Sequence, residues 1–472
     1  MNAQSTSVVV IGGGPGGYEA ALVGAHLGAR VTIVEKDGVG GAAVLTDCVP
    51  SKALIATADY LSEFETAADL GVRLEDSQGG AVSDASAELG EINTRVLGLA
   101  GAQSDDIATR LREVGVRILD GAARVVSPTL VEVTAPDGMV EQLETDVILI
   151  ATGATPRVMD TARPDGERIL TWQQIYELPE LPQRLIVVGS GVTGAELAQA
   201  YLGLGCDVVL VSSRDRVLPG EDPDAAQVIE EVFKKRGMEV LGRSRMAAVR
   251  RVSDADGDGV VVTLEDGREV RGSHALLAVG SIPQTSDLGL EEVGVQLSES
   301  GHVVVDRVSR TNVRGIYAAG DCTGVLPLAS VAAMQGRIAM SHALGDAVTP
   351  LNLRVVSANI FTDPEIATVG VSQKEIDDGT VNARVSMLPL SRNPRAKMLG
   401  ITDGFVKLFA QPGSGAVLGG VVVAPRASEL IFPVTIAVAH RLHVDQLAAT
   451  FTVYPSLSGS IAEAARRLHT TD

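Results

Sequence analysis

One glycine-rich pattern occurs twice in this chain of 472 residues, each time directly after a short apolar run. The first copy, Gly12–Gly17, follows Val8–Ile11, and the second copy, Gly189–Gly194, follows Leu185–Val188. Both copies fit G-x-G-x-x-G between a strand and a helix, which is the arrangement that binds dinucleotides. A duplicated unit of this kind predicts an α/β fold with two nucleotide sites.

In the first copy, three glycines have separate physical tasks. Gly12 allows the tight turn, Gly14 lets the backbone approach a pyrophosphate, and Gly17 lets helix and strand pack closely. The helix that follows offers free N–H groups and the positive end of its dipole to the phosphates. Glu35 ends the next strand, where a carboxylate can accept hydrogen bonds from an adenosine ribose. The first unit is therefore predicted to bind a dinucleotide.

The second copy differs at the end of its second strand. The residues there are Ser212, Ser213 and Arg214, where a site that prefers NAD usually carries an acid. Without the carboxylate and with a cation, such a site accommodates the 2′-phosphate of NADPH. The alternative is that Arg214 only faces solvent, as most arginines do. Two nucleotide sites in one chain predict a hydride donor, NADPH or NADH, and a bound flavin.

The charges and the cysteines exclude several classes of protein. With 59 acidic and 39 basic side chains the formal net charge is −20, so the surface repels nucleic acid and anionic membranes. No apolar stretch is long enough to span a bilayer, and no signal peptide precedes the first apolar run. Three cysteines, and histidines without ligand spacing, indicate neither a disulfide scaffold nor a metal site. We expect a cytoplasmic protein with no metal and no stable membrane insertion.

Five further segments carry a family resemblance. The segment Gly40–Lys52 resembles the redox-active segment of the flavoprotein disulfide reductases, the group of lipoamide dehydrogenase and glutathione reductase. Ala151–Pro156 and Gly320–Asp321 resemble other flavin-contacting motifs of that family, and Phe361–Ala367 and Tyr454–Ser458 resemble motifs of its dimerisation domain. These matches extend in order along essentially the whole chain. The resemblance implies FAD as a bound cofactor and a homodimer.

The length is too great for a single hydrophobic core, so several domains are expected. We predict two Rossmann-like dinucleotide-binding domains, for FAD and for NAD(P), and a C-terminal α+β dimerisation domain. The expected bounds are 1–155 and 280–349 for the two parts of the FAD-binding domain, 156–279 for the NAD(P)-binding domain, and 350–472 for the dimerisation domain. A helical region from Lys52 to about Val116 is expected to be interrupted by an acidic, glycine-rich stretch at 75–88.

The resemblance also implies roles by position. Glu35 would hold the adenosine ribose of FAD, and Asp321 its ribityl chain. Lys52 would lie beside flavin N5, paired with Glu196, so that its charge favours the reduced flavin while Glu196 offsets its desolvation. The residues expected to contact the cofactors are Gly12, Gly14, Pro15, Gly17, Glu35, Lys36, Gly41, Ala42, Cys48, Lys52, Ala123, Ala151, Thr152, Gly153, Gly189, Gly191, Val192, Gly194, Ser212, Ser213, Arg214, Gly280, Asp321, Leu328 and Ala329.

The chain departs from the family at the residues that reduce disulfides. The first cysteine of the family aligns with Ala43, so Cys48 has no internal disulfide partner there. The family's catalytic histidine aligns with Tyr454, and the glutamate that orients it aligns with Gly459. A phenol whose ordinary pKa is about 10 is a poor general base at neutral pH. These three losses predict that thiol–disulfide chemistry is gone.

The three cysteines are interpreted differently. Cys48 stands where the family keeps its flavin-facing thiol, and it could form a charge-transfer contact or a transient flavin adduct. We favour the alternative, a small buried residue, because one thiol cannot exchange two electrons by forming a disulfide. Cys206 and Cys322 are expected to be structural. The catalytic residues are then predicted to be Cys48, Lys52, Glu196 and Tyr454.

A disulfide reductase works in two steps: NAD(P)H reduces the flavin, and the flavin then reduces a disulfide through the dithiol. With intact nucleotide sites but no dithiol, only the first of these steps is left. NAD(P)H can reduce the flavin, and a diffusible quinone can accept the electrons without a nucleophile. The segments Gly40–Lys52 and Tyr454–Gly459 look closest to members of the family that act as NAD(P)H:quinone reductases. We predict this activity, by a ping-pong mechanism, with Tyr454 acting across a homodimer and donating a hydrogen bond to the developing quinol oxygen. A packed core position is the alternative for Tyr454.

Other functions stay open. A soluble pyridine nucleotide transhydrogenase is the main enzymatic alternative, because that related group also carries tyrosine before the proline. Its members typically keep the first cysteine and lose the second, which is the reverse of this chain. A non-catalytic flavin-bearing subunit of a complex is the alternative outside enzymes. The losses at Ala43 and Tyr454 argue against residual lipoamide reduction.

Overall fold

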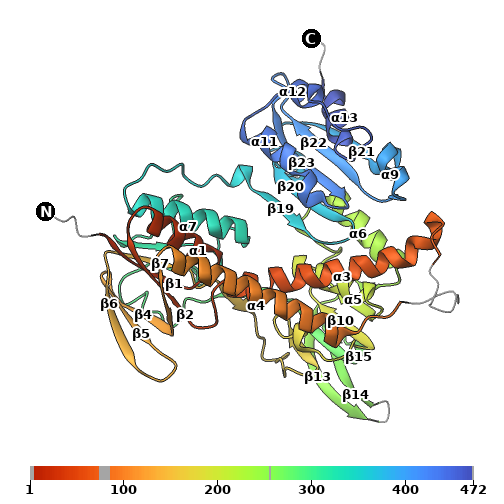
Figure 1. Ribbon diagram of the computed structural model, residues 1–472. Helices are drawn as coiled ribbons and strands as arrows, with labels where there is room; N and C mark the ends of the chain where they lie inside the picture. The colour runs from red at the N-terminus through yellow and green to blue at the C-terminus, as the bar shows by residue number, and fades with distance from the viewer. Residues whose placement is uncertain (1–4, 74–84, 255–256, 470–472) are drawn as a thin grey trace. The chain divides into compact units, whose positions relative to one another are not determined.

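A computed structural model describes residues 5–73, 85–254 and 257–469 of the chain (Figure 1). The chain forms two compact units, each assembled from three separate stretches. The first unit comprises Met1–Ser51, Asn93–Arg157 and Val279–Asn352, and the second comprises Lys52–Ile92, Val158–Ala278 and Leu353–Asp472. The acidic interruption expected at 75–88 falls mainly on 74–84, outside the described residues. The four-part division of the chain stays a prediction.

The first unit is built around a five-stranded parallel sheet with the strand order β18-β7-β1-β2-β3. Four of the five residues of β1 and all residues of β7 are buried. Such continuous apolar runs are expected where both faces of a parallel sheet are covered. The strands are β1 (Ser7–Ile11), β2 (Arg30–Glu35), β3 (Arg117–Asp120), β7 (Val147–Ile150) and β18 (Ile316–Ala318).

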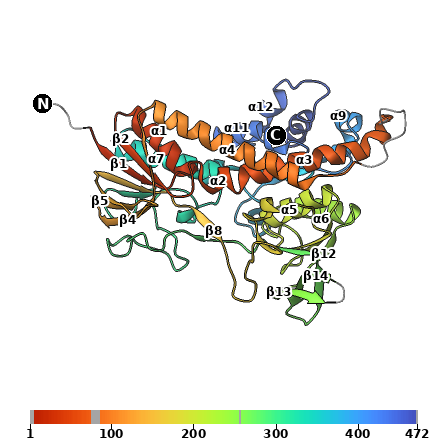
Figure 2. The same ribbon diagram turned by 60° about the horizontal axis from the view of Figure 1, so that its bottom comes forward.

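Helices α1 (Pro15–His26) and α7 (Ala329–Ala343) lie side by side against this sheet (Figure 1 and Figure 2). They approach so closely that a Cβ on Gly336 would lie 2.0 Å from the carbonyl oxygen of Gly16. The other elements of the first unit are α2 (Gly41–Leu45), the antiparallel strands β4 (Ala122–Ser127), β5 (Leu130–Thr134) and β6 (Val140–Glu144), the pair β8 (Ala154–Pro156) and β17 (Ser281–Pro283), and the 3-10 turn η3 (Asp321–Thr323). The long helices α3 (Cys48–Thr66) and α4 (Leu89–Glu113) each contribute residues to both units.

The second unit contains another five-stranded parallel sheet, with the order β12-β11-β10-β16-β9. Its strands are β9 (Ile169–Thr171), β10 (Arg184–Val188), β11 (Asp207–Val211), β12 (Glu239–Leu241) and β16 (His274–Leu277). Helix α5 (Val192–Gly203) follows β10, and α6 (Pro223–Lys235) follows β11. A separate antiparallel sheet contains β13 (Met246–Asp254), β14 (Gly257–Leu264) and β15 (Glu269–Gly272).

The two parallel sheets repeat one local geometry. Within each sheet, the strand before the glycine pattern pairs in parallel with the strand after the helix, β1 with β2 and β10 with β11. Gly12 and Gly189 have φ angles of 101° and 111°, in the left-handed region that favours glycine. The predicted duplication of a dinucleotide-binding unit is confirmed.

From Ser357 onward the second unit forms an antiparallel sheet without a glycine pattern. Its order is β19-β20-β23-β22-β21, and helices pack against it around an apolar core. The elements are β19 (Ser357–Ile360), β20 (Glu365–Gly370), α8 (Gln373–Asp377), β21 (Arg384–Pro389), α9 (Pro394–Met398), β22 (Phe405–Ala410), β23 (Val417–Ala424), α10 (Ala427–Leu430), α11 (Phe432–Ala439), α12 (Val444–Ala449) and α13 (Gly459–Arg467). This confirms the expected C-terminal α+β domain. None of the helices in the described ranges combines the length and the apolar character that crossing a membrane requires.

Candidate active site

The first glycine pattern forms a turn that only glycine can make. A Cβ on Gly12 would lie 2.3 Å from the carbonyl oxygen of Ala151, and a Cβ on Gly17 would lie 1.9 Å from that of Gly12. No atom lies within 4 Å of the Cβ position of Gly14, so this side of the turn is open. Helix α1 begins at Pro15 without a side-chain cap, which leaves its N-terminal N–H groups available to an anion.

Glu35 ends β2 beside this turn. Its carboxylate accepts hydrogen bonds from the backbone N–H of Gly13 at 2.5 Å, and from those of Lys36 and Asp37 at 2.8 Å each. Its carbonyl oxygen accepts one from the N–H of Gly121, which places β4, with Ala123 near its start, next to the end of β2. The carboxylate therefore lies at the glycine pattern, as expected, and its role toward a ribose stays a prediction.

Several other residues expected at FAD lie at the same carboxyl edge of the first sheet. Thr152 follows β7, and its hydroxyl donates to the carbonyl of Gln284 at 2.6 Å. Asp321 follows the adjacent strand β18, and burial raises the pKa of its carboxyl. Gly41 approaches the first pattern, since its Cβ would lie 2.8 Å from the Cα of Gly14. The members of the predicted set on the first sheet and its connections are Gly12, Gly14, Pro15, Gly17, Glu35, Lys36, Gly41, Ala42, Ala151, Thr152, Gly153 and Asp321, with Leu328 and Ala329 at the N-terminus of α7 and Gly280 directly before β17.

The second glycine pattern repeats this geometry in the second unit. A Cβ on Gly189 would lie 2.2 Å from the carbonyl oxygen of Ala278, and one on Gly194 would lie 1.8 Å from that of Gly189. Gly191 has no atom within 4 Å of its Cβ position, and α5 begins at Val192 without a side-chain cap. This arrangement can bind a second pyrophosphate.

The loop after β11 differs in one respect from the expectation. Ser212 is fully buried, and its hydroxyl lies 2.7 Å from that of Ser190. It shapes the loop, whereas Ser213 and Arg214 are exposed. The carbonyl of Arg214 accepts a hydrogen bond from the N–H of Arg243 at 2.6 Å. Arg243, which the sequence did not single out, follows β12 closely and so lies at the same carboxyl edge of the sheet.

A partly buried ion pair joins Lys52 of α3 to Glu196 of α5 within the second unit. The ammonium lies 2.8 Å from Glu196 Oε2, and the Glu196 side chain is 3% exposed. Glu196 Oε1 accepts a hydrogen bond from the N–H of Phe361 at 2.8 Å, and the Lys52 ammonium lies 5.0 Å from the centre of the Phe361 ring. The predicted pairing is confirmed, and Phe361, which was expected only as part of a motif of the dimerisation domain, contacts both members of the pair.

Beside Glu196 lies a small cavity, with ≈ 10 Å³ of space for the centres of water molecules, lined by residues that include Asp59, Gln199 and Arg236. Partial burial, together with repulsion from Asp363, raises the pKa of Asp59 to about 7. Gln199 fixes the segment that follows Phe361 through two hydrogen bonds of 2.9 Å with the backbone of Asp363. Sequence reasoning did not single out Asp59, because no motif contains it.

Two of the three cysteines are buried as expected, but the favoured interpretation of Cys48 as a small buried residue is not borne out. Cys206 and Cys322 are buried, and burial raises their pKa values to about 12 and about 11. Cys48 is half-buried at the start of α3, one helical turn before Lys52. Ala43 lies in α2 and offers no thiol. The burial of Cys206 and Cys322 agrees with the structural roles expected for them, and these roles stay a prediction.

Tyr454 is 82% exposed and lies next to two other exposed apolar side chains, Phe451 and Val453. It is therefore not a core residue of its own chain, which removes one of the two interpretations of Tyr454. Gly459 begins α13, and its N–H donates to the Ser456 hydroxyl at 3.2 Å. No carboxylate stands at this position.

Comparisons with known proteins agree with this geometry. Residues 6–336 match the family described as pyridine nucleotide-disulphide oxidoreductase, and residues 356–465 match its dimerisation domain. An NAD(P)H dehydrogenase (quinone) of Mycobacterium tuberculosis is 54% identical, and the alignment covers 99% of this chain and 94% of that protein. A dihydrolipoyl dehydrogenase of Zymomonas mobilis is 31% identical, with 98% and 97% covered. The crystal structure of LpdA from Mycobacterium tuberculosis has a TM-score of 0.92 at 54% identity, with 98% of this chain and 100% of that chain covered.

Proposed function

Because the chain belongs to the pyridine nucleotide-disulphide oxidoreductase family, whose cofactors are FAD and NAD(P)H, we propose that it is an NAD(P)H:quinone oxidoreductase. One observation carries the proposal: both nucleotide patterns have the required geometry, while Ala43 replaces the thiol that disulfide reduction requires. The 54% identical relative of Mycobacterium tuberculosis, which is named NAD(P)H dehydrogenase (quinone), supports the choice of acceptor.

The residues of the first unit fit FAD. Gly12 and Gly17 make the tight turn, the open side of Gly14 admits a pyrophosphate, and the uncapped N-terminus of α1 supplies N–H donors. Glu35 would hold the adenosine ribose, and Asp321 would accept hydrogen bonds from the ribityl hydroxyls. When bound, FAD accepts a hydride from NAD(P)H and gives two electrons to an acceptor.

The second unit would bind the nicotinamide coenzyme at Gly189–Gly194. Arg214 and Arg243 are exposed and lie just after the adjacent strands β11 and β12. The end of β11 carries no carboxylate. Although the exposed Asp215 follows Arg214, two cations and no carboxylate at the strand end suit a 2′-phosphate better than a free ribose hydroxyl pair. We therefore propose that NADPH is accepted at least as well as NADH.

Lys52 would supply a fixed positive charge at the reacting centre. Glu196 holds the ammonium at 2.8 Å and is itself held by the N–H of Phe361, so the charge is placed before any ligand binds. A fixed cation stabilises electron density that arrives near it. Glu196 offsets the cost of partly burying the lysine.

The C-terminal domain would complete the site in a homodimer. The exposed group formed by Phe451, Val453 and Tyr454 is apolar enough to need a covering surface, and a second copy of the chain would provide it. Tyr454 would then donate a hydrogen bond to the quinone in the other subunit. A cytoplasmic location fits a diffusible nicotinamide coenzyme and a chain with only three cysteines.

The test reduces the purified protein anaerobically with one equivalent of NADPH and then mixes it with a naphthoquinone, while the flavin absorbance is followed. Rapid and stoichiometric return of the oxidised flavin spectrum is the expected result. A flavin that stays reduced with quinone, and is reoxidised only by a nicotinamide analogue, identifies a transhydrogenase instead. A flavin that neither NADPH nor NADH reduces contradicts the proposal and favours a non-catalytic subunit.

A further inference from the structure

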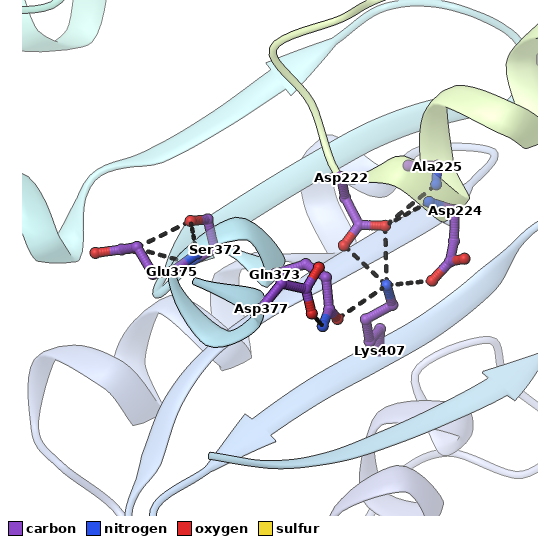
Figure 3. Close-up of polar contacts among 8 residues, drawn as sticks. All are labelled: Asp222, Asp224, Ala225, Ser372, Gln373, Glu375, Asp377 and Lys407. Carbon is purple, nitrogen blue, oxygen red and sulfur yellow. Dashed lines mark hydrogen bonds and ion pairs between the residues drawn. The ribbon is translucent and has the colours of Figure 1, made fainter. Parts of the chain in front are cut away.

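A buried lysine of strand β22 connects the C-terminal sheet to helix α6 within the second unit (Figure 3). The side chain of Lys407 is 1% exposed, and its ammonium lies 2.9 Å and 2.8 Å from the two carboxylate oxygens of Asp222. Oδ2 of Asp224 lies at 2.5 Å and the amide oxygen of Gln373 at 3.4 Å. Because the Asp222 side chain is 3% exposed, water hardly screens this pair.

Burial of strand β22 does not require a charge at this position. The other residues of the strand are apolar and buried, namely Phe405, Val406, Leu408, Phe409 and Ala410. Lysine is almost never fully buried unless it is paired, and apolar side chains often replace a buried ion pair without loss of stability. We therefore infer that Lys407 is present because the buried carboxylate of Asp222 needs a counter-charge, and not because the strand needs a lysine.

Asp222 ends the loop 212–222 that follows β11. Its carboxylate accepts hydrogen bonds from the N–H groups of Asp224 at 3.0 Å and Ala225 at 3.2 Å, and so caps α6. The same loop begins at Ser212 and carries Arg214, which is proposed to face the coenzyme phosphate. Lys407 thus holds the far end of the loop on which this arginine lies.

The beginning and the middle of the loop contact the second glycine pattern. The Ser212 hydroxyl bonds that of Ser190 at 2.7 Å, and the N–H of Leu218 donates to the Ser190 carbonyl at 2.8 Å. Leu218 has a φ of 50°, which residues with a side chain adopt only when their surroundings enforce it. Two further hydrogen bonds hold the middle of the loop, from the N–H of Val217 to Glu230 at 3.1 Å and from the N–H of Arg243 to the Arg214 carbonyl at 2.6 Å. Lys407 holds the far end of the loop, at Asp222.

We propose that Lys407 is a positioning residue for the nicotinamide coenzyme. By holding Asp222, it fixes the loop 212–222, and the loop in turn places Arg214 and the Ser190 backbone at the glycine pattern. Lys407 acts through Asp222 and not by contact with the coenzyme. The inference rests on the proposed coenzyme site at Gly189–Gly194 and adds to it a residue from the C-terminal domain.

The effect of Lys407 on coenzyme binding must be separated from its effect on the stability of the fold. Lys407→Met leaves Asp222 charged and buried, which is strongly destabilising in general. In the double variant Lys407→Met/Asp222→Asn, the asparagine keeps an acceptor for the cap of α6 and no unpaired buried charge remains at Asp222. The matched control is Lys235→Met, which removes an exposed ion pair of 3.6 Å between α6 and Asp403 of the C-terminal part.

The measurement is the dissociation constant of NADP+ by equilibrium titration of the full-length, FAD-loaded proteins without quinone, with thermal unfolding followed in parallel. We expect the double variant to unfold near the wild-type temperature and to bind NADP+ on the order of tenfold more weakly. In turnover, KM for NADPH should rise while kcat changes little. Lys235→Met should bind NADP+ as the wild type does.

Wild-type affinity in the folded double variant overturns the proposal, and so does equal weakening in Lys235→Met. Should the double variant fail to fold, Asp222→Ala provides the test, because it removes the oxygens that Lys407 holds while Lys407 keeps Asp224 as its counter-charge. Failure of the coenzyme site is a distinct result: the wild type then binds neither NADP+ nor NAD+, whatever the Lys407 variants do. Normal wild-type binding with unaffected Lys407 variants contradicts only the role of Lys407.

Discussion

Replacing Arg214 with alanine should lower the preference for NADPH without affecting NADH. The guanidinium is exposed, and within the described part of the chain no carboxylate pairs with it, so no internal partner competes for a phosphate. A hydrogen bond to a charged group contributes about 1.5–3 kcal/mol, and solvent exposure moves this site to the lower end. A loss of about 1.4 kcal/mol corresponds to about tenfold in kcat/KM for NADPH. NADH has no 2′-phosphate, so its kcat/KM should not change.

The assay measures kcat/KM for both coenzymes with a naphthoquinone as acceptor, at low and at high salt. Because the contact is exposed, the loss should shrink as salt screens it. The control is Arg245→Ala, which removes another exposed arginine, paired with Glu265 at 3.8 Å. An equal loss with NADPH and NADH, or a loss of the same size in Arg245→Ala, would refute the assignment of Arg214 to the phosphate.

Four other substitutions test the remaining parts of the site. Glu196→Gln should slow flavin reduction by NADPH in rapid mixing and cost about 2 kcal/mol of stability, because Lys52 loses its counter-charge; an unchanged rate contradicts its role. Asp59→Asn tests the pKa of about 7, because a carboxyl whose pKa is raised on folding contributes stability that is lost as the pH rises through that value. The variant should therefore be more stable to heat than the wild type at about pH 8, but not at about pH 5. Ala43→Cys should not produce disulfide reductase activity, measured as NADPH-dependent thiol release; full activity would show that a thiol pair with Cys48 suffices without a histidine at Tyr454 and a glutamate at Gly459. Tyr454→Phe should slow reoxidation by quinone up to about tenfold and leave flavin reduction by NADPH unchanged, since one hydrogen bond is lost in the second half-reaction only.

The parts of the molecule that local sequence controls could be predicted. The glycine patterns require φ angles and close approaches that other residues cannot adopt, so Gly12 and Gly189 reveal their turns without a structure. The burial of Cys206 and Cys322 also follows from their apolar strands and turns. The pairing of Lys52 with Glu196 could be predicted only through the family resemblance, because nothing local joins α3 to α5.

Contacts between distant segments could not be predicted. Lys407 appears in the sequence as one charged residue in an apolar strand, and only the folded chain shows that Asp222 neutralises it. Asp59 lies in no motif, and its raised pKa depends on Asp363, which the fold brings near. Ser212 has the residue type of a ligand, but its hydroxyl is used by the loop itself. In each case tertiary packing, and not local pattern, decides what the polar group does.

Cys48 gives the unmodified chain a single point for chemical attachment. Of its three thiols, two are fully buried with pKa values raised to about 11 and about 12, so alkylating reagents at neutral pH should reach only the half-buried thiol at the start of α3. A fluorophore or spin label can therefore be placed one helical turn from Lys52 without removing any native cysteine. A label at this position would report by spectroscopy on the surroundings of Lys52.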